Sequence, residues 1–191
     1  MKRINWIKVL FAGIFLILMI FNGCVSKKPV RDILPVVEQN SMPPVNFSEQ
    51  TTWLLGYINP RLLTLEPHSE WYMKEYESYQ PDKDVINELL KISKDGLTIK
   101  IVMGTWCPDS RREVPRFMGI LDSWQFSPEN VTFIGVDNVK VSPVGEYFKL
   151  DIQRVPTFIL YIKNVEAGRI IENPITSLEQ DMVNILTRNE N

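Results

Sequence analysis

The chain has 191 residues, of which 45% are hydrophobic and 23% are charged, so it is long enough for one ordinary domain with a buried core. This balance excludes a disordered chain, a collagen-like chain and a coiled coil. Two cysteines and one histidine exclude a disulfide scaffold and most zinc sites, and we expect neither a metal nor a cofactor. The net charge of -2 gives no electrostatic reason to expect nucleic acid as a partner.

The N-terminal segment has the pattern of an export signal. Three basic residues among the first eight precede an unbroken apolar run over residues 9–21, as in a secretory signal peptide. The run is short for a membrane-spanning helix, which needs about 20 apolar residues. An uncleaved anchor is the alternative, because Ile4, Trp6 and Ile7 could lengthen the run. We predict a signal peptide over residues 1–23.

A small residue followed by a cysteine comes directly after this run, at Gly23 and Cys24. This segment resembles the lipobox of bacterial lipoproteins, which implies cleavage before Cys24 and acylation of its thiol. An ordinary apolar cysteine near the end of a signal is the alternative. Several acyl chains hold a protein stably on a membrane, whereas one chain is marginal. The resemblance therefore implies an exported, membrane-anchored protein of the bacterial cell envelope, on the periplasmic side, with Cys107 as its only free thiol.

Residues 24–50 are predicted to be a lipid-anchored tether between membrane and domain. Polar residues separate its four prolines, and prolines at this density favour extended conformations: Pro29, Pro35, Pro43 and Pro44. The apolar residues of the segment 33–37 could instead dock on the domain.

Residues 51–97 are expected to form an N-terminal elaboration. Residues 52–58 suit a strand or a short buried segment. Residues 69–79 carry four aromatic side chains at helical spacing, which indicates a core-facing stripe, with a binding face as the alternative: Trp71, Tyr72, Tyr76 and Tyr79. A second helix is expected to open at Asp82 and to stop at Gly96. His68, just before the first helix, is expected at the surface or as a helix cap.

Residues 98–191 alternate strand and helix patterns and form the main predicted domain. Strands are expected over residues 98–103, 131–136, 157–162 and 168–171, and helices over 110–124, 144–150 and 176–187. A β-α-β unit followed by a hairpin and a final helix predicts a sheet with helices on both faces.

The residues that carry chemistry lie after the first of these strands, where Cys107 is placed at the start of a helix. Free backbone N–H groups and the positive end of the helix dipole favour a thiolate there. Arg111 and Arg112 add positive charge, and Ser110 can donate a hydrogen bond towards the sulfur, whereas Asp109 is a nearby negative charge that opposes ionisation. The alternative for a lone cysteine is a buried and inert side chain.

Residues 106–110 (Trp-Cys-Pro-Asp-Ser) resemble the active-site segment of thioredoxin-fold proteins, with Ser110 in the place of the second cysteine. Pro115 matches the proline that bends the active-site helix of that family, and residues 154–157 (Arg-Val-Pro-Thr) resemble its cis-proline loop. The resemblance covers residues 98–187 and implies a thioredoxin-like three-layer α/β/α sandwich with an N-terminal helical elaboration. The whole chain is similar to exported thioredoxin-like bacterial lipoproteins.

The resemblance implies a thiol–disulfide exchange protein whose site residues have distinct roles. Catalysis would involve Cys107 and Ser110, and the substrate would be bound by Trp106, Pro108, Val155 and Pro156. A serine hydroxyl cannot resolve a mixed disulfide, so the expected mechanism uses one thiol and needs a separate thiol reductant. Ile101 stands where reductases of the family carry a buried acid, which fits the same mechanism. The expected partners are thiols or disulfides of exported proteins.

Two other functions stay open from the sequence. The same groove could hold an extended peptide on the membrane surface without thiol exchange, because a fold does not imply an activity. A single-cysteine glutaredoxin-like protein would use glutathione or an iron–sulfur cluster, but the glycine pair expected for that ligand is absent around Gly168.

Overall fold

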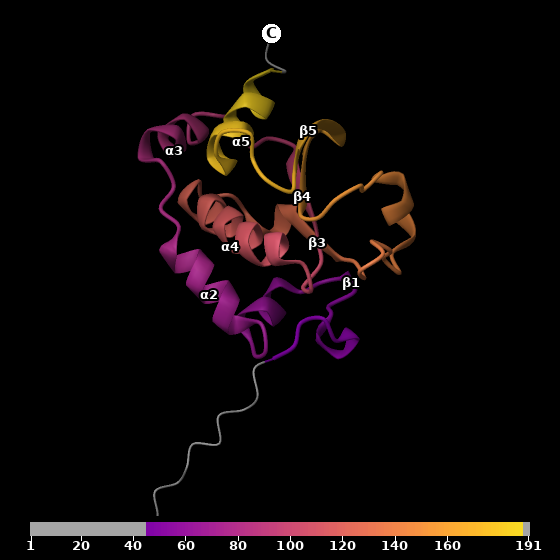
Figure 1. Ribbon diagram of the computed structural model, residues 1–191. Helices are drawn as coiled ribbons and strands as arrows, with labels where there is room; N and C mark the ends of the chain where they lie inside the picture. The colour runs from indigo at the N-terminus through magenta and orange to yellow at the C-terminus, as the bar shows by residue number, and fades with distance from the viewer. Residues whose placement is uncertain (1–44, 189–191) are drawn as a thin grey trace, which may run out of the picture. The chain divides into compact units, whose positions relative to one another are not determined.

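A five-stranded sheet in the order β1-β3-β2-β4-β5 organises residues 45–188, the part of the chain that the computed structural model describes (Figure 1). The predicted signal peptide, the predicted lipidation site Cys24 and the predicted tether up to residue 44 lie outside the described residues. The strands are β1 (Gly56–Tyr57), β2 (Leu97–Met103), β3 (Val131–Gly135), β4 (Thr157–Ile162) and β5 (Val165–Ile171).

Four α-helices and four short 3-10 helices complete the described region. The α-helices, numbered as in Figure 1, are α2 (Ser69–Ser78), α3 (Lys83–Leu89), α4 (Pro108–Ser123) and α5 (Leu178–Thr187). The 3-10 helices are η1 (Gln50–Thr52), η2 (Pro60–Thr64), η3 (Pro128–Asn130) and η4 (Gly145–Lys149). No helix within residues 45–188 is long and apolar enough to cross a membrane.

Strand β2 is the central strand and fixes the two faces of the sheet. It runs parallel to β3 and antiparallel to β4, so that Ile101 lies opposite both Phe133 and Phe158. Side chains alternate along a strand, and Ile101 and its alternate neighbours enter one core while Val102 enters the other. Both faces are therefore buried, as the apolar sequence of the strand predicts.

All four α-helices contribute to the larger core, on one face of the sheet. Helices α4 and α5 lie over the strands, α2 packs along α4, and α3 packs along α5 (Figure 1). Phe117 of α4 stacks on Phe158 of β4 with ring centroids 4.2 Å apart. The helix α4 is continuous through Pro115, which lies within it and is buried.

The opposite face is covered by η4 and the connection between β3 and β4. Val144, Tyr147 and Leu150 pack there with Val102 and the other inward side chains of this face. The prediction of a thioredoxin-like α/β fold is confirmed by the mixed sheet and by the order of its elements. The short helix expected over residues 144–150 is a 3-10 helix over Gly145–Lys149.

Several predicted helix ends are confirmed by their caps. The Asp82 carboxylate accepts hydrogen bonds from the N–H groups of Asp84 and Val85 at 2.8 and 3.2 Å, and the Ser177 hydroxyl caps α5. Helix α3 ends at Leu89, so the prediction that it runs to Gly96 is wrong. Gly96 instead adopts a positive φ of 67° immediately before β2, a conformation that glycine tolerates best.

The strand expected over residues 52–58 is reduced to two residues. Gly56 pairs with Gly135 in an antiparallel edge, and η1 occupies residues 50–52 instead. Gly135 is required at this crossing because a Cβ atom there would collide with the Leu54 carbonyl oxygen. The aromatic stripe of α2 packs against the core as expected, with Tyr72 buried and the other three aromatics partly buried.

Candidate functional site

Cys107 lies at the N-cap of α4, at the junction between β2 and that helix. Its N–H donates to the Gly104 carbonyl at 2.9 Å, and its own carbonyl accepts from Arg111 N–H at 3.1 Å. Within residues 45–188 the amides of Asp109 and Ser110 have no hydrogen-bond partner. Two free backbone donors and the helix dipole therefore favour a negative charge at the start of α4.

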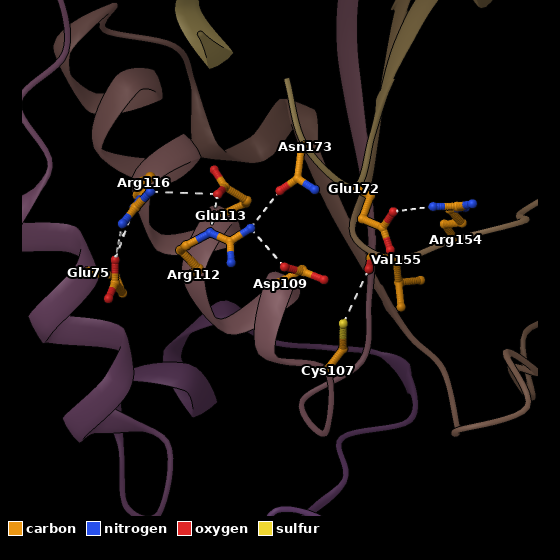
Figure 2. A network of polar contacts seen from close by, with 10 residues as sticks. All are labelled: Glu75, Cys107, Asp109, Arg112, Glu113, Arg116, Arg154, Val155, Glu172 and Asn173. Atoms are coloured by element: carbon orange, nitrogen blue, oxygen red, sulfur yellow. Dashed lines mark hydrogen bonds and ion pairs between the residues drawn. The ribbon is translucent and has the colours of Figure 1, made fainter. Parts of the chain in front are cut away.

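The Cys107 thiol contacts the loop that precedes β4. Its Sγ donates a hydrogen bond to the Val155 carbonyl oxygen at 3.3 Å, although the two residues are 48 positions apart (Figure 2). The Val155–Pro156 peptide bond is cis. Within the described residues the Val155 amide has no partner, so this residue offers a free backbone donor next to the sulfur.

A groove of about 420 Å³ opens over this contact. Cys107 is 7% exposed and forms part of the groove wall. The groove is lined by Trp106, Cys107, Asn138, Lys140, Gln153, Arg154, Val155 and Glu172. The lining is rich in polar and charged side chains and includes the backbone of Val155, which suits a peptide better than an apolar ligand.

Trp106 forms a fixed part of the groove wall. Its indole N–H donates to the Val136 carbonyl at 3.0 Å, and its ring lies 6.5 Å from that of Trp53. Gly104 makes room for the indole, because a Cβ atom at this position would come within 2.5 Å of the Trp106 ring. The predicted role of Trp106 in shaping the surface beside the sulfur is therefore compatible with its position.

Ser110 occupies a different position from the one expected. It is fully buried, and its hydroxyl accepts a hydrogen bond from Gly104 N–H at 3.3 Å. No hydrogen bond joins it to Cys107 Sγ within residues 45–188. Ser110 therefore ties the start of α4 to the end of β2 while the thiol is protonated.

The two prolines named from the sequence differ in exposure. Pro108 is the exposed first residue of α4 and borders a second cavity, on the side of α4 that faces α2. Pro156 is buried and its carbonyl accepts from Glu172 N–H at 2.7 Å, which holds the Val155 loop against the residue that follows β5. Of the two loop residues expected to bind substrate, Val155 lines the groove and Pro156 does not.

A chain of ion pairs crosses α4 beside the thiol (Figure 2). Arg112 contacts Asp109 at 2.8 Å, Glu113 at 2.6 Å and the Asn173 side chain at 2.6 Å. Its hydrogen bond to Glu113 raises the pKa of Arg112. Arg116 continues the chain, contacting Glu113 at 3.6 Å and Glu75 of α2 at 2.6 Å. The acidic side chains around the first two turns of α4 are thus paired with arginines.

Arg111 takes no part in these ion pairs and contacts an aromatic ring instead. Its guanidinium carbon lies 4.6 Å from the centroid of the Phe47 ring, within cation–π distance. Burial lowers the pKa of Arg111, and the nearby Cys107 opposes this shift. Phe47 falls in the predicted tether, so the packed part of the chain begins at least as early as this residue.

His68 is the N-cap residue of α2, which is one of the two expected positions, but the expectation of a surface side chain is wrong. The side chain is 3% exposed, makes no capping hydrogen bond and lies between the rings of Phe47 and Trp71, each at 5.8 Å. Desolvation lowers the pKa of His68, and the positive charge of Arg111 lowers it further. No hydrogen bond connects His68 with Cys107 among the described residues, so these two do not form a catalytic pair.

Thr105 is a supporting residue that the sequence does not reveal. Its buried hydroxyl donates to the Thr52 carbonyl and accepts from Leu54 N–H, both at 3.2 Å. The N-terminal segment therefore holds the loop that carries Trp106 and Cys107. No local motif marks such a contact, because its partners are more than 50 residues away. Residues 45–188 contain no group of three or more side chains suited to binding a metal.

Known proteins give only distant matches to this chain. No protein-family model matches the sequence, and no curated protein matches it. Among solved structures, a Pseudomonas aeruginosa protein of unknown function matches with a TM-score of 0.49 and 13% identity, over 65% of this chain and 86% of that one. Mitochondrial thioredoxin 3 of Saccharomyces cerevisiae, in its oxidised form, matches with a TM-score of 0.35 and 17% identity, over 60% of this chain and 98% of that one. An HIV epitope-scaffold protein matches with a TM-score of 0.41 and 12% identity, over 63% and 76%.

Proposed function

We propose that the protein is a thiol–disulfide exchange protein that uses a single thiol, Cys107, and is held in the bacterial cell envelope by a lipid on Cys24. The observation that carries the proposal is the contact between Cys107 Sγ and the Val155 carbonyl, at 3.3 Å in the wall of an open groove. A reactive sulfur beside unpaired backbone groups is the arrangement that a disulfide-bearing peptide needs in order to dock and react.

The exchange step conserves atoms and electrons. The Cys107 thiolate attacks one sulfur of a partner disulfide, a new S–S bond forms, and the other partner sulfur leaves as a thiolate that takes a proton from water. A partner sulfenic acid reacts in the same way, with loss of water. A thiol of a separate reductant then attacks the mixed disulfide and releases Cys107, since Ser110 has no sulfur with which to do so.

Ionisation of Cys107 also changes what the site can bind. The thiol proton is the donor in the hydrogen bond to Val155, so its loss frees the Val155 carbonyl. The same residue then has both a free N–H and a free C=O, which is what one residue of an extended strand pairs with. The free amides of Asp109 and Ser110 stabilise the thiolate in place of the lost hydrogen bond.

The test is covalent capture by the reduced full-length chain, with Cys24→Ser introduced in every variant so that Cys107 is the only thiol outside the substitutions under test. A peptide disulfide is added, and the intact mass is measured before and after excess dithiol. We expect an adduct on the wild-type protein that dithiol removes, and no adduct on Cys107→Ser. Wild-type protein that forms no adduct would overturn the proposal.

A non-catalytic peptide-binding module is the second candidate, and the groove lining favours it independently of the sulfur. Cys107→Ala separates the two functions, because it keeps the groove and removes the thiol. A binding module retains its affinity for a peptide in this variant. An exchange protein loses capture and keeps at most weak reversible binding.

A further inference from the structure

Positive charges without acidic partners surround the start of α4. Lys74, Arg111 and Lys140 form no ion pair within residues 45–188. Lys140 lines the groove of about 420 Å³ that contains Cys107. Arg111 and Lys74 line the second cavity, of about 210 Å³, on the other side of the helix start. Lys140 therefore lies on one side of the start of α4, and Arg111 with Lys74 lies on the other.

The carboxylates next to the two cavities and to Cys107 are already engaged. Glu172 lines the groove, Glu75 lines the second cavity, and Asp109 is two residues after Cys107. Each forms an ion pair with an arginine: Asp109 with Arg112 at 2.8 Å, Glu172 with Arg154 at 2.6 Å and Glu75 with Arg116 at 2.6 Å. The Asp137 carboxylate accepts from the backbone N–H groups of Val139 and Val141, at 3.0 and 2.8 Å. Lys74, Arg111 and Lys140 thus have no ion-pair partner among the described residues, so a ligand can supply their counter-charge.

The form of that ligand follows from the backbone beside the sulfur. Val155 has an amide without a partner among the described residues, and a main chain in extended conformation is the group that pairs with such a donor. Two cavities on opposite sides of the α4 start fit side chains on both sides of a reacting cysteine. A small anion could contact the Val155 amide or occupy one of the cavities, whereas an extended peptide can contact the amide and both cavities.

Building on the proposed function, we propose that the partner of Cys107 is an extended acidic peptide segment, with carboxylate side chains on both sides of its own cysteine. Lys140 binds the carboxylates on the groove side, and Arg111 with Lys74 binds those on the α2 side. The net charge of the whole chain is -2, so its overall field opposes an acidic ligand. A preference for acidic peptides therefore reports on the local cations and decreases as salt screens them.

Three peptide disulfides test this inference when they differ only in the residues that flank the cysteine, which are glutamate, glutamine or lysine. The rate constant for adduct formation is measured with the reduced full-length protein carrying Cys24→Ser, at low and at high salt. We expect the acidic peptide to react fastest and the basic one slowest, with a difference of about tenfold at low ionic strength that shrinks at high ionic strength.

Two substitutions assign the effect to named residues. Lys140→Gln and Arg111→Gln should each lower the ratio of the acidic to the neutral rate by about threefold, since each removes one charge contact. The ratio is used because a change in the thiol itself alters both rates alike. Lys91→Gln is the matched control, because this exposed lysine lies beyond α3 and lines neither cavity.

The outcomes distinguish this inference from the proposed function. Equal rates for the three peptides, or a faster basic peptide, would overturn the acidic preference and leave thiol exchange standing. An unchanged rate ratio in both variants would show that neither Lys140 nor Arg111 carries the preference, and would overturn the assignment. Absence of an adduct with all three peptides would overturn the proposed function itself.

Discussion

Arg112 holds the carboxylate of Asp109 in an ion pair of 2.8 Å at the start of α4. Asp109 is two residues from Cys107, so its negative charge disfavours a thiolate at that position. Arg112 offsets this charge and is itself fixed by Glu113 and Asn173 (Figure 2). The helix dipole favours an acidic residue such as Asp109 at the helix N-terminus. Because Arg112 neutralises this residue, its charge destabilises the neighbouring thiolate little.

Arg112→Gln should slow alkylation of Cys107 at neutral pH by roughly two- to fivefold, because Asp109 then acts on the thiol uncompensated across a partly solvated distance. The measurement is the alkylation rate as a function of pH in chains carrying Cys24→Ser, so that Cys107 is the only thiol. The double variant Asp109→Asn/Arg112→Gln should regain the wild-type rate. A single variant that reacts as fast as wild type would show that the ion pair has no influence on the thiol.

Thr105→Val should lower the free energy of unfolding by about 1–3 kcal/mol, because the Leu54 amide loses its acceptor and the Thr52 carbonyl loses its donor. Valine has nearly the shape of threonine, so the change reports on the hydroxyl. Urea denaturation provides the measurement. Thr176→Val is the control, because this exposed side chain makes no hydrogen bond within residues 45–188, and it should change stability by less than about 0.5 kcal/mol. Equal effects at the two positions would contradict the role given to Thr105.

Gly135→Ala should lower the free energy of unfolding by at least about 1–3 kcal/mol, because the added methyl group would collide with the Leu54 carbonyl and the Ile58 side chain. Gly145→Ala is the matched control, because nothing lies within 4 Å of the Cβ position there. Urea denaturation of both variants compares the two sites. A tolerated Gly135→Ala would mean that β1 does not cross β3 as closely as described.

His68 should make the protein less stable as the pH falls below about 6.5, the ordinary pKa of histidine. Burial lowers its pKa in the folded state, so between that lowered pKa and 6.5 the unfolded chain binds a proton that the folded chain does not. Stability is therefore complete above this window and decreases as the pH falls through it.

The measurement is the urea midpoint of wild type and His68→Phe between about pH 5 and pH 7.5. The variant should show a flatter profile, since the chain has no other histidine. Parallel profiles for the two proteins would contradict the burial of His68.

The sheet and its main helices could be predicted because their signals are local. The β-branched alternation of residues 98–103, the continuous apolar run of 131–136 and the side-chain caps at Asp82 and Ser177 each specify an element within a few residues. The proximity of Cys107 and Val155 could also be predicted, although the residues are 48 positions apart in the sequence. Both segments resemble parts of the active site of the same protein family.

The remaining features depend on tertiary contacts that no local pattern encodes. His68 is buried where the rings of Phe47 and Trp71 pack against it. Ser110 bonds to Gly104 because the end of β2 folds back over the helix start. Lys140 reaches the groove through a connection that has little regular structure, so its place beside Cys107 could not be read from spacing.

Release of a captured peptide without added thiol, from the wild-type site and from Ser110→Cys, both in chains carrying Cys24→Ser, tests the account most directly. Intact mass is followed over time after the excess peptide has been removed. The account predicts that the wild-type mixed disulfide persists until an external thiol is added, while Ser110→Cys expels the peptide and forms an internal disulfide. A wild-type adduct that disappears as fast as that of the variant, or that never forms, would contradict it.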